Sequence, residues 1–209
     1  MPKTATREKP ILFSSAMILA ILSGKKSITR RVIKPQPDAT VLSYYPGGIT
    51  CGVLEDYETG VRLGYGFEDE DRQWKSLAAP GDRLWVRETW QPARNGDTGE
   101  AMAIYKADWE SNGSPQGPEG GKWKPSMFMP RWASRITLEV TEVRCERLHE
   151  ISDADAIAEG IEIDKEQFPC LVPRAAFKEL WDSIHNKKAS HWYSNPWVFC
   201  YTFRRLDDG

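Results

Sequence analysis

The residues best suited to chemistry lie together in the segment 24–31, which reads GKKSITRR. Two lysines, two hydroxyl side chains and two arginines occupy positions 25 to 31. A threonine hydroxyl is a poor nucleophile until a base removes its proton, and a lysine becomes such a base where burial lowers its pKa. Lys26 and Thr29 are therefore candidates for nucleophilic catalysis. The same cations also suit an anion or a nucleic acid, and a solvated turn is the structural alternative.

A lysine base is often oriented by a carboxylate, and the sequence offers two candidates for that role. Glu159 directly precedes Gly160 at the end of a predicted helix, and Glu88 lies in a predicted strand. Each has a structural alternative: Glu159 as an exposed helix residue, and Glu88 paired with Arg87 or with a neighbouring strand. If residues 27–31 are extended, Thr29 and Arg31 share one face, and Lys26 at the turn can reach either face.

Metal and nucleotide chemistry are weakly indicated. His149, His185 and His191 are scattered, and Cys145-x3-His149 is only a fragment of a ligand set. No glycine-rich phosphate loop follows a predicted strand. We therefore expect no metal and no cofactor.

Tryptophans in predicted loops form a second group of candidates. Trp132 follows Arg131 directly, and Trp123 lies between two lysines. Aromatic rings interleaved with basic side chains can stack nucleic-acid bases. The alternative is that these rings clamp long loops onto the body of the protein.

Composition limits the classes of protein that remain. The chain has 209 residues, 28 of them basic and 30 acidic, with a net charge of -2. This excludes a globally basic nucleic-acid binder but not a local basic patch. The longest apolar run, 16–22, is far below the roughly twenty residues of a membrane span. The four cysteines show no CxxC pairing, and no signal peptide is visible, so we expect a cytoplasmic protein with reduced thiols and no membrane partner.

The elements that must position these residues form an α+β pattern. Helices are predicted at 15–23, 152–160 and 173–185, and strands at 41–45, 49–54, 61–67, 83–90, 102–106, 135–148 and 197–204. The apolar alternation of 135–148 slips by one residue after Val140, which predicts a β-bulge. We therefore expect a small, strongly bent β-barrel with about three flanking helices. Residues 1–9 read as a loose tail and 10–209 as one domain.

Three motifs in order resemble those of the ASCH family, a branch of the PUA-like superfamily of small barrels. Segment 24–31 is similar to the family's G-[KR]-K-[ST]-x-T-x-R, and 81–86 (GDRLWV) is similar to its G-D-x-L-x-V. Segment 148–160 (LHEISDADAIAEG) is similar to its strand exit and A-x-x-E-G helix. The pattern continues through WVRETW at 85–90, MPRWASR at 129–135, LWDSI at 180–184 and NPWV at 195–198. The longer ASCH proteins of phages and prophages share this wider pattern.

The resemblance implies a hydrolase of acylated nucleosides such as N(4)-acetylcytidine. It assigns Thr29 as the nucleophile, Lys26 as its base and Glu159 as the group that orients the lysine. From the basic segment, the second carboxylate and the loop aromatics, the further candidates for binding substrate or nucleic acid are Lys25, Arg30, Arg31, Glu88, Arg131 and Trp132. Relative to the small members of the family, this chain has insertions near 34–80, 91–132 and 161–196.

Two alternatives stay open beside the amidohydrolase. The first is an RNA-binding protein or ribonuclease that uses the basic segment 25–34, so the expected partner is a nucleoside or RNA; no DNA-specific motif is found. The second is a non-catalytic phage accessory protein that acts through protein contacts. Convergence of Lys26, Thr29 and Glu159 in a closed pocket would favour the enzyme, and an open groove would favour binding.

Overall fold

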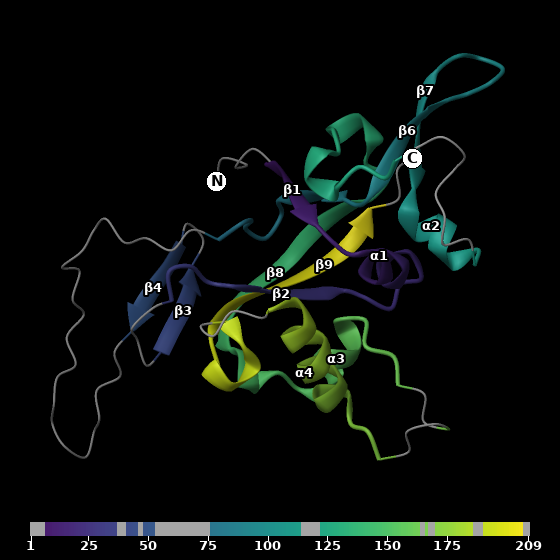
Figure 1. The fold of residues 1–209 in the computed structure, drawn as a ribbon. Coiled ribbons are helices and arrows are strands. Elements are labelled where there is room, and N and C mark those ends of the chain that lie inside the picture. The colour runs from purple at the N-terminus through teal and green to yellow at the C-terminus, as the bar shows by residue number, and fades with distance from the viewer. Residues whose placement is uncertain are drawn as a thin grey trace, which may run out of the picture.

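The computed structural model describes residues 7–36, 41–45, 48–52, 76–113, 122–163, 166, 170–185 and 190–206, and only the backbone of 41–45 and 48–52. These residues form a mixed α+β fold (Figure 1). A central sheet runs through it, and helices lie on both sides of the edge strand that carries the segment 28–32. No helix in the described ranges is long and apolar enough to cross a membrane.

The central sheet has five strands in the order β1-β5-β8-β9-β2. Their bounds are β1 Glu8–Leu12, β5 Arg83–Arg87, β8 Thr137–Arg147, β9 Trp197–Leu206 and β2 Ile28–Val32. β1 runs parallel to β5, and the other pairs are antiparallel. Within the described residues β1 and β2 are the two edges, with no backbone pairing between them. Closure of the sheet into a barrel therefore stays a prediction.

The long strands β8 and β9 confirm the predicted bulge. Their register shifts between Val140 and Glu142. Leu138 and Val140 before the shift and Val143 after it all lie in the main core. The extra residue therefore keeps apolar side chains on the inner face while the strand bends. That core lies between the sheet and α1 (Ser15–Leu22), with Phe13 and Phe203 packed ring to ring at 6.3 Å.

A smaller core covers the other face of the sheet. It is built from α3 (Asp153–Ala158), α4 (Pro173–Ile184) and the β9 residue Val198. Figure 1 shows α3 and α4 together beside β2 and β9. Ser152 caps α3 by accepting a hydrogen bond from the Asp155 amide, as its position in the sequence predicts. On α4 the apolar residues Phe177 and Trp181, four positions apart, are buried, whereas Ile184 is exposed.

The remaining elements lie mostly in the predicted insertions. They are the hairpins β3–β4 and β6–β7 and the helix α2, with bounds Val41–Tyr45, Gly48–Gly52, Trp90–Arg94, Ala101–Tyr105 and Lys106–Ser111. The sequence gives no prediction of α2. Two 3-10 turns, Ser126–Phe128 and Arg131–Ala133, precede β8. The predicted strand at 61–67 lies outside the described residues.

Two predicted boundaries need correction. Residues 1–9 are not a loose tail throughout, because Glu8 and Lys9 belong to β1 and pair with β5. The polar pentapeptide EKPIL lacks a clear alternation, and its Pro10 is tolerated because β1 is an edge strand. The predicted strand 83–90 is also two strands, since β5 ends at Arg87 and β6 starts at Trp90.

Candidate active site

Two helix ends bring Lys26 and Glu159 together. Gly24 follows α1 with a φ of 75°, and Gly160 follows α3 with a φ of 91°. Glycine reaches this left-handed region without steric cost, so the chain turns sharply after each helix. The backbones of Lys26 and Glu159 then pair through an isolated antiparallel bridge. The motif glycines therefore position the two predicted site residues side by side.

The Lys26 and Glu159 side chains form a buried ion pair. Lys26 Nζ lies 2.6 Å from Glu159 Oε2, and it also donates to the Glu159 carbonyl oxygen at 2.8 Å. The two side chains are 0% and 5% exposed. Burial lowers the pKa of Lys26 below its usual range, although the Glu159 carboxylate acts in the opposite direction. A buried lysine with a lowered pKa is the kind of group that can accept a proton near neutral pH.

Thr29 lies in β2, three residues after Lys26 and opposite Tyr201 of β9. It is only 3% exposed. Within the described residues its hydroxyl makes no hydrogen bond, and none joins it to Lys26 or Glu159. The structure therefore brings Lys26 and Glu159 into direct contact, and within the described part of the chain the Thr29 hydroxyl has no hydrogen-bond partner.

Arg31 shares the Thr29 face of β2, as the alternation of a strand predicts. Its guanidinium donates to the Leu12 carbonyl at 2.7 Å and lies 5.1 Å from the centre of the Phe13 ring. Lys26 Nζ lies 5.8 Å from the centre of the same ring. Arg31 Nε is buried and has no partner among the described residues. This face thus combines a hydroxyl, an ammonium and an unpaired guanidinium N–H.

Arg30 points to the opposite face, where its side chain is fully buried among carboxylates. It contacts Glu146 of β8 at 2.6 Å, Asp155 of α3 at 2.6 Å and Glu159 at 3.3 Å. The guanidinium Nε also donates to Glu146 at 2.8 Å. With 0% of its side chain exposed, Arg30 does not reach the surface, where a nucleic-acid phosphate would have to bind it.

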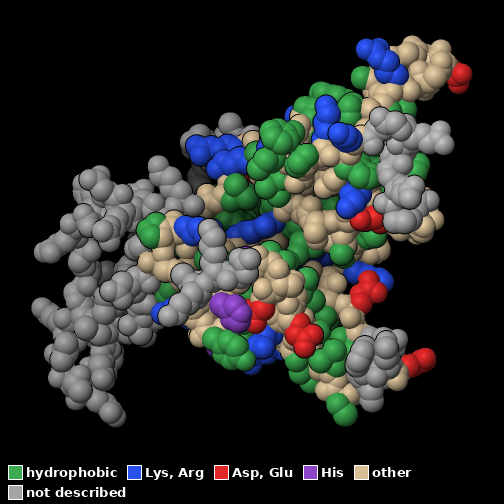
Figure 2. Space-filling model, in the orientation of Figure 1, with side chains coloured by type: hydrophobic (Ala, Val, Ile, Leu, Met, Phe, Trp, Pro, Cys, Tyr) green, Lys and Arg blue, Asp and Glu red, His purple; other side chains and the backbone are tan. Residues whose placement is uncertain are grey.

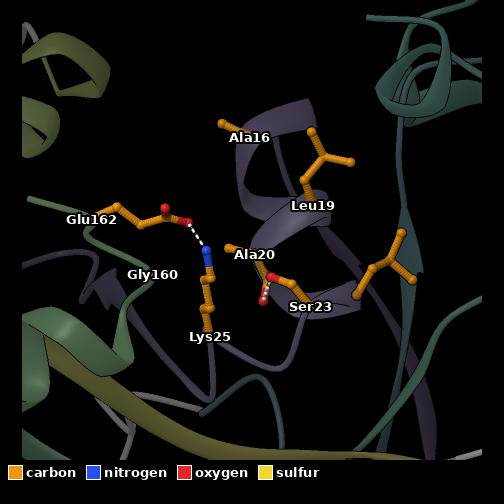
Figure 3. Close-up of a pocket in the computed structure, with 8 residues that line it drawn as sticks. Ala16, Leu19, Ala20, Ser23, Lys25, Gly160 and Glu162 are labelled. Atoms are coloured by element: carbon orange, nitrogen blue, oxygen red, sulfur yellow. Dashed lines mark hydrogen bonds and ion pairs between the residues drawn. The ribbon is translucent and has the colours of Figure 1, made fainter. Parts of the chain in front are cut away.

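Lys25 is the cation of this segment that stays accessible. Its side chain is 54% exposed, and its Nζ pairs with Glu162 at 2.8 Å. Both residues line an open pocket of about 620 Å³ together with apolar side chains of α1. Figure 3 shows the Lys25–Glu162 pair beside Ala16, Leu19 and Ala20 of that helix. Gly160 also lines the pocket, so the hollow lies beside the Lys26–Glu159 pair. Neither Lys26 nor Thr29 lines it.

Glu88 belongs to a different cluster. Its carboxylate accepts two hydrogen bonds from Arg135, at 2.9 and 3.1 Å, and Arg135 also pairs with Asp108 at 2.7 Å. Burial raises the pKa of Glu88, although Arg135 opposes this. The partner of Glu88 is thus neither Lys26 nor Arg87 but Arg135, which lies just before β8. Of the two candidate carboxylates, Glu159 is the one that contacts Lys26.

Arg131 and Trp132 lie in the second 3-10 turn. Arg131 pairs with Glu8 at 3.1 Å and lies 6.0 Å from the centre of the Trp85 ring. Trp132 is 56% exposed and packs edge-on against Trp90 at 5.8 Å. These contacts place both residues on the outer surface, in a cluster with no contact to the Lys26–Glu159 pair among the described residues.

Sequence reasoning missed the carboxylates Glu146 and Asp155. A signal for Asp155 was present, because Asp155 and Glu159 are four residues apart in a helical segment and so share a face. Glu146 gave no such signal, since its partner Arg30 lies 116 residues away in the chain. Phe13 contacts both Lys26 and Arg31, and its place just before the predicted helix 15–23 gives no signal of that role.

The described residues contain no cluster of three or more His, Cys, Asp and Glu side chains suited to a metal ion. His149 Nε2 instead lies 2.9 Å from the carbonyl oxygen of Trp192. Cys145, Cys170 and Cys200 are free thiols.

Comparisons with known proteins give little for this chain. No protein-family model matches it, and no curated protein matches it. Among solved structures it is similar to protein EF3133 from Enterococcus faecalis V583, described under the family-model DUF984. The identity is 10% and the TM-score is 0.39, with 98% of this chain and 83% of that chain covered. A TM-score this low does not establish a shared fold.

Proposed function

We propose that this protein is an ASCH-type amidohydrolase that removes an acyl group from a modified nucleoside such as N(4)-acetylcytidine. Thr29 is the nucleophile, Lys26 its base and Glu159 the group that orients the lysine. The observation that carries the proposal is the buried contact of 2.6 Å between Lys26 and Glu159. These residues are 133 positions apart, and the motifs that resemble the ASCH family contain both.

The proposed reaction follows from the chemistry of these groups. Neutral Lys26 takes the proton of the Thr29 hydroxyl, and Thr29 Oγ1 bonds to the acyl carbon. The bond between that carbon and the exocyclic nitrogen then breaks, and the departing amine takes the proton from Lys26. Water, deprotonated in the same way, hydrolyses the acyl-threonine and frees the acid. Arg31 Nε, buried and unpaired on the face of Thr29, is suited to the oxyanion of both steps.

The barrel of the ASCH fold is part of the same proposal. The two edge strands of the described sheet approach each other at one point, because Arg31 of β2 donates to the carbonyl of Leu12, the last residue of β1. The ring contact between Phe13 and Phe203 of β9 spans the same interior. Both contacts support a sheet that curves back on itself.

A release assay tests the proposal. We expect the wild type to convert N(4)-acetylcytidine to cytidine and acetate, detected by chromatography and mass spectrometry. Thr29→Val keeps the size of the side chain and removes the hydroxyl, so turnover should stop while the fold survives. Thr29→Ser is the matched control and should retain part of the activity. Full turnover by Thr29→Val would eliminate Thr29 as the nucleophile.

RNA binding is the second candidate function. The surface around Trp85 and the two 3-10 turns is better suited to it than the basic segment 25–34. Two arginines flank the Trp85 ring there: Arg87 at 4.5 Å and Arg131 at 6.0 Å. Arg87 also donates to the carbonyl of Met127. The large apolar side chains exposed on these turns are Met127, Phe128 and Trp132. Figure 2 shows hydrophobic side chains gathered beside Lys and Arg side chains above β1.

This aromatic–basic surface is suited to stacked bases and phosphates of a single strand. If it binds RNA, Trp132→Ala should weaken binding of a labelled single-stranded RNA in an anisotropy titration. Removing Arg87 should make the salt dependence shallower by about 0.7 in log–log slope. Lys25→Ala tests the basic segment in the same assay. An unchanged affinity in Trp132→Ala would exclude this surface.

A further inference from the structure

Arg30 occupies a position that the motif leaves unspecified, between the threonine and the last arginine of G-[KR]-K-[ST]-x-T-x-R. Its side chain is nevertheless one of the most buried charges in the described residues, at 0% exposure. The sequence suggests a substrate or nucleic-acid contact for it, but three carboxylates already bind it.

We propose that Arg30 is a positioning residue, which holds the Glu159 carboxylate in place and so controls the protonation of Lys26. This inference rests on the proposed function, in which Lys26 is a base. Glu159 is shared between two cations: Oε1 accepts from Arg30 at 3.3 Å and Oε2 accepts from Lys26 at 2.6 Å. Arg30 therefore fixes the orientation of the carboxylate that meets the lysine.

The rest of the Arg30 fork is anchored on two other elements. Glu146 holds it to β8, and Asp155 holds it to α3. Because the guanidinium is planar and its donors have fixed directions, these two contacts also determine where its remaining nitrogen points. That nitrogen is Nη1, which donates to Glu159 Oε1. Arg30 thus fixes Glu159, at the end of α3, relative to the sheet.

The charge of Arg30 matters as much as its geometry. A lysine that faces an unshared carboxylate is held as ammonium and cannot act as a base. Arg30 competes for the same carboxylate, and its own positive charge disfavours a second cation nearby. Without Arg30, Glu159 would act on Lys26 alone. The charges that act on Lys26 are those of Glu159, Arg31 and Arg30. Arg30 in turn contacts Glu146 of β8 and Asp155 of α3, and Arg144 of β8 also contacts Asp155.

The alternative is that Arg30 only ties α3 to β8. The two roles differ in what they do to Lys26. If Arg30 only links α3 to β8, its substitution lowers the stability of the protein and reduces activity equally at every pH. A positioning residue that is removed raises the proton affinity of Lys26, so the loss is greatest at low pH and is recovered at high pH.

The activity test uses Arg30→Gln with Arg144→Gln as its matched control. Arg144 binds Asp155 at 3.3 Å and makes no contact with Glu159. We expect kcat/KM of Arg30→Gln to fall on the order of tenfold near pH 7 and to approach the wild type at higher pH. Arg144→Gln should keep the pH midpoint of the wild type. A loss in Arg30→Gln that is equal at every pH would overturn the proposal.

A direct measurement separates this inference from the proposed function. The pKa of Lys26 can be followed by NMR through the chemical shift of its labelled ε-carbon, whether or not the protein is an enzyme. We expect the midpoint to rise in Arg30→Gln and to stay at its wild-type position in Arg144→Gln. If the Lys26 midpoint rises in Arg30→Gln but the wild type has no amidohydrolase activity, the role of Arg30 is supported and the proposed function is refuted. An unchanged midpoint in Arg30→Gln would refute the role of Arg30.

Arg30→Gln leaves the largely buried Glu146 with only its longer contact to Arg144 at 3.9 Å among the described residues, and can fail to fold for that reason. The charge-balanced pair Arg30→Gln with Glu146→Gln removes one charge of each sign, so it keeps the measurement possible. Asp155 retains Arg144 in that variant. The same rise in the Lys26 midpoint is expected there, and its absence would count against the proposal equally.

Discussion

Gly160 offers a quantitative test of the contact that brings Lys26 and Glu159 together. Its φ is +91°, and a Cβ added there would lie 2.9 Å from the Cβ of Ala20 and 3.3 Å from the Cβ of Lys26. Gly24 is a matched control, because it also follows a helix end, has a φ of +75° and would meet nothing within 4 Å. Substitution by alanine forces a side chain into the left-handed backbone conformation at both positions and destabilises both variants. Only Gly160→Ala adds a steric conflict.

The magnitudes follow from these two contributions. The left-handed conformation costs alanine roughly 1–2 kcal/mol. A methyl group forced into a packed contact costs roughly a further 1–3 kcal/mol. The reduced freedom of the unfolded chain favours alanine by about 0.4–1 kcal/mol in both variants and cancels in the comparison. We therefore expect Gly160→Ala to be less stable than Gly24→Ala by about 1–3 kcal/mol.

Urea unfolding followed by tryptophan fluorescence measures this difference, and thermal unfolding checks it. A chain of this length shifts its midpoint by about 2–4 °C per kcal/mol. Because the conflict involves the Cβ of Lys26, the Lys26–Glu159 contact should also loosen in Gly160→Ala. Equal destabilisation of the two variants would show that α3 does not approach α1 as closely as these distances require.

Two further predictions concern the ion pair itself. Glu159→Gln alone should destabilise the protein by about 3–5 kcal/mol, because it leaves the buried Lys26 without the carboxylate that it contacts. Lys26→Met should cost less, because Glu159 keeps Arg30 as a partner. The double variant should cost less than the sum, and additive losses in a double-mutant cycle by urea unfolding would argue against the pair. The pKa of Lys26 is lowered mainly by burial, so between that lowered value and 10.5 the unfolded chain binds more protons than the folded chain. The stability of the wild type relative to Lys26→Met should therefore increase as the pH rises from 7 towards 10.5, and a decrease over that range would mean that the Glu159 charge outweighs burial.

Local patterns in the sequence predicted the two helices and the long strand that help to position the site, but they gave β2 only as a condition. Ser152 and Gly160 delimit the helix that carries Glu159, and the slip after Val140 locates the bulge of β8. These features depend on neighbours within a few residues, so they can be recognised without the rest of the fold. The contact of Lys26 with Glu159 came from the family resemblance, since nothing local joins two segments 133 residues apart.

Alternation alone could not predict whether Arg30 and Arg31 face solvent or the interior of the protein. Alternation places Thr29 and Arg31 on one face and Arg30 on the other, and the structure agrees. It does not say which face is solvated, and here both faces of β2 are covered. Thr29 and Arg30 are 3% and 4% exposed, because one core packs on each side. A segment with four cations therefore suggests a surface patch, although most of its charge is turned inward.

Each inward cation of the segment has a partner from a distant part of the chain. Lys26 meets Glu159, Arg30 meets three carboxylates, and Arg31 meets a backbone carbonyl of β1. Counted with Arg144, three cations and three carboxylates form one connected network, so its net charge is zero. The network consists of Lys26, Arg30, Arg144, Glu146, Asp155 and Glu159.

A balanced network has a consequence for the residue at its end. Lys26 touches the network only through Glu159, and Glu159 is itself restrained by Arg30. The charge of Arg30 therefore acts on the protonation of Lys26 through their shared carboxylate, because buried charges are poorly screened. The proton affinity of Lys26 then depends on how Glu146 and Asp155 hold Arg30, and not on Glu159 alone. If Lys26 is the base, substitutions of Glu146 or Asp155 that release Arg30 should alter the pH at which it works without touching the substrate, whereas substitution of the partly exposed Arg144 should not.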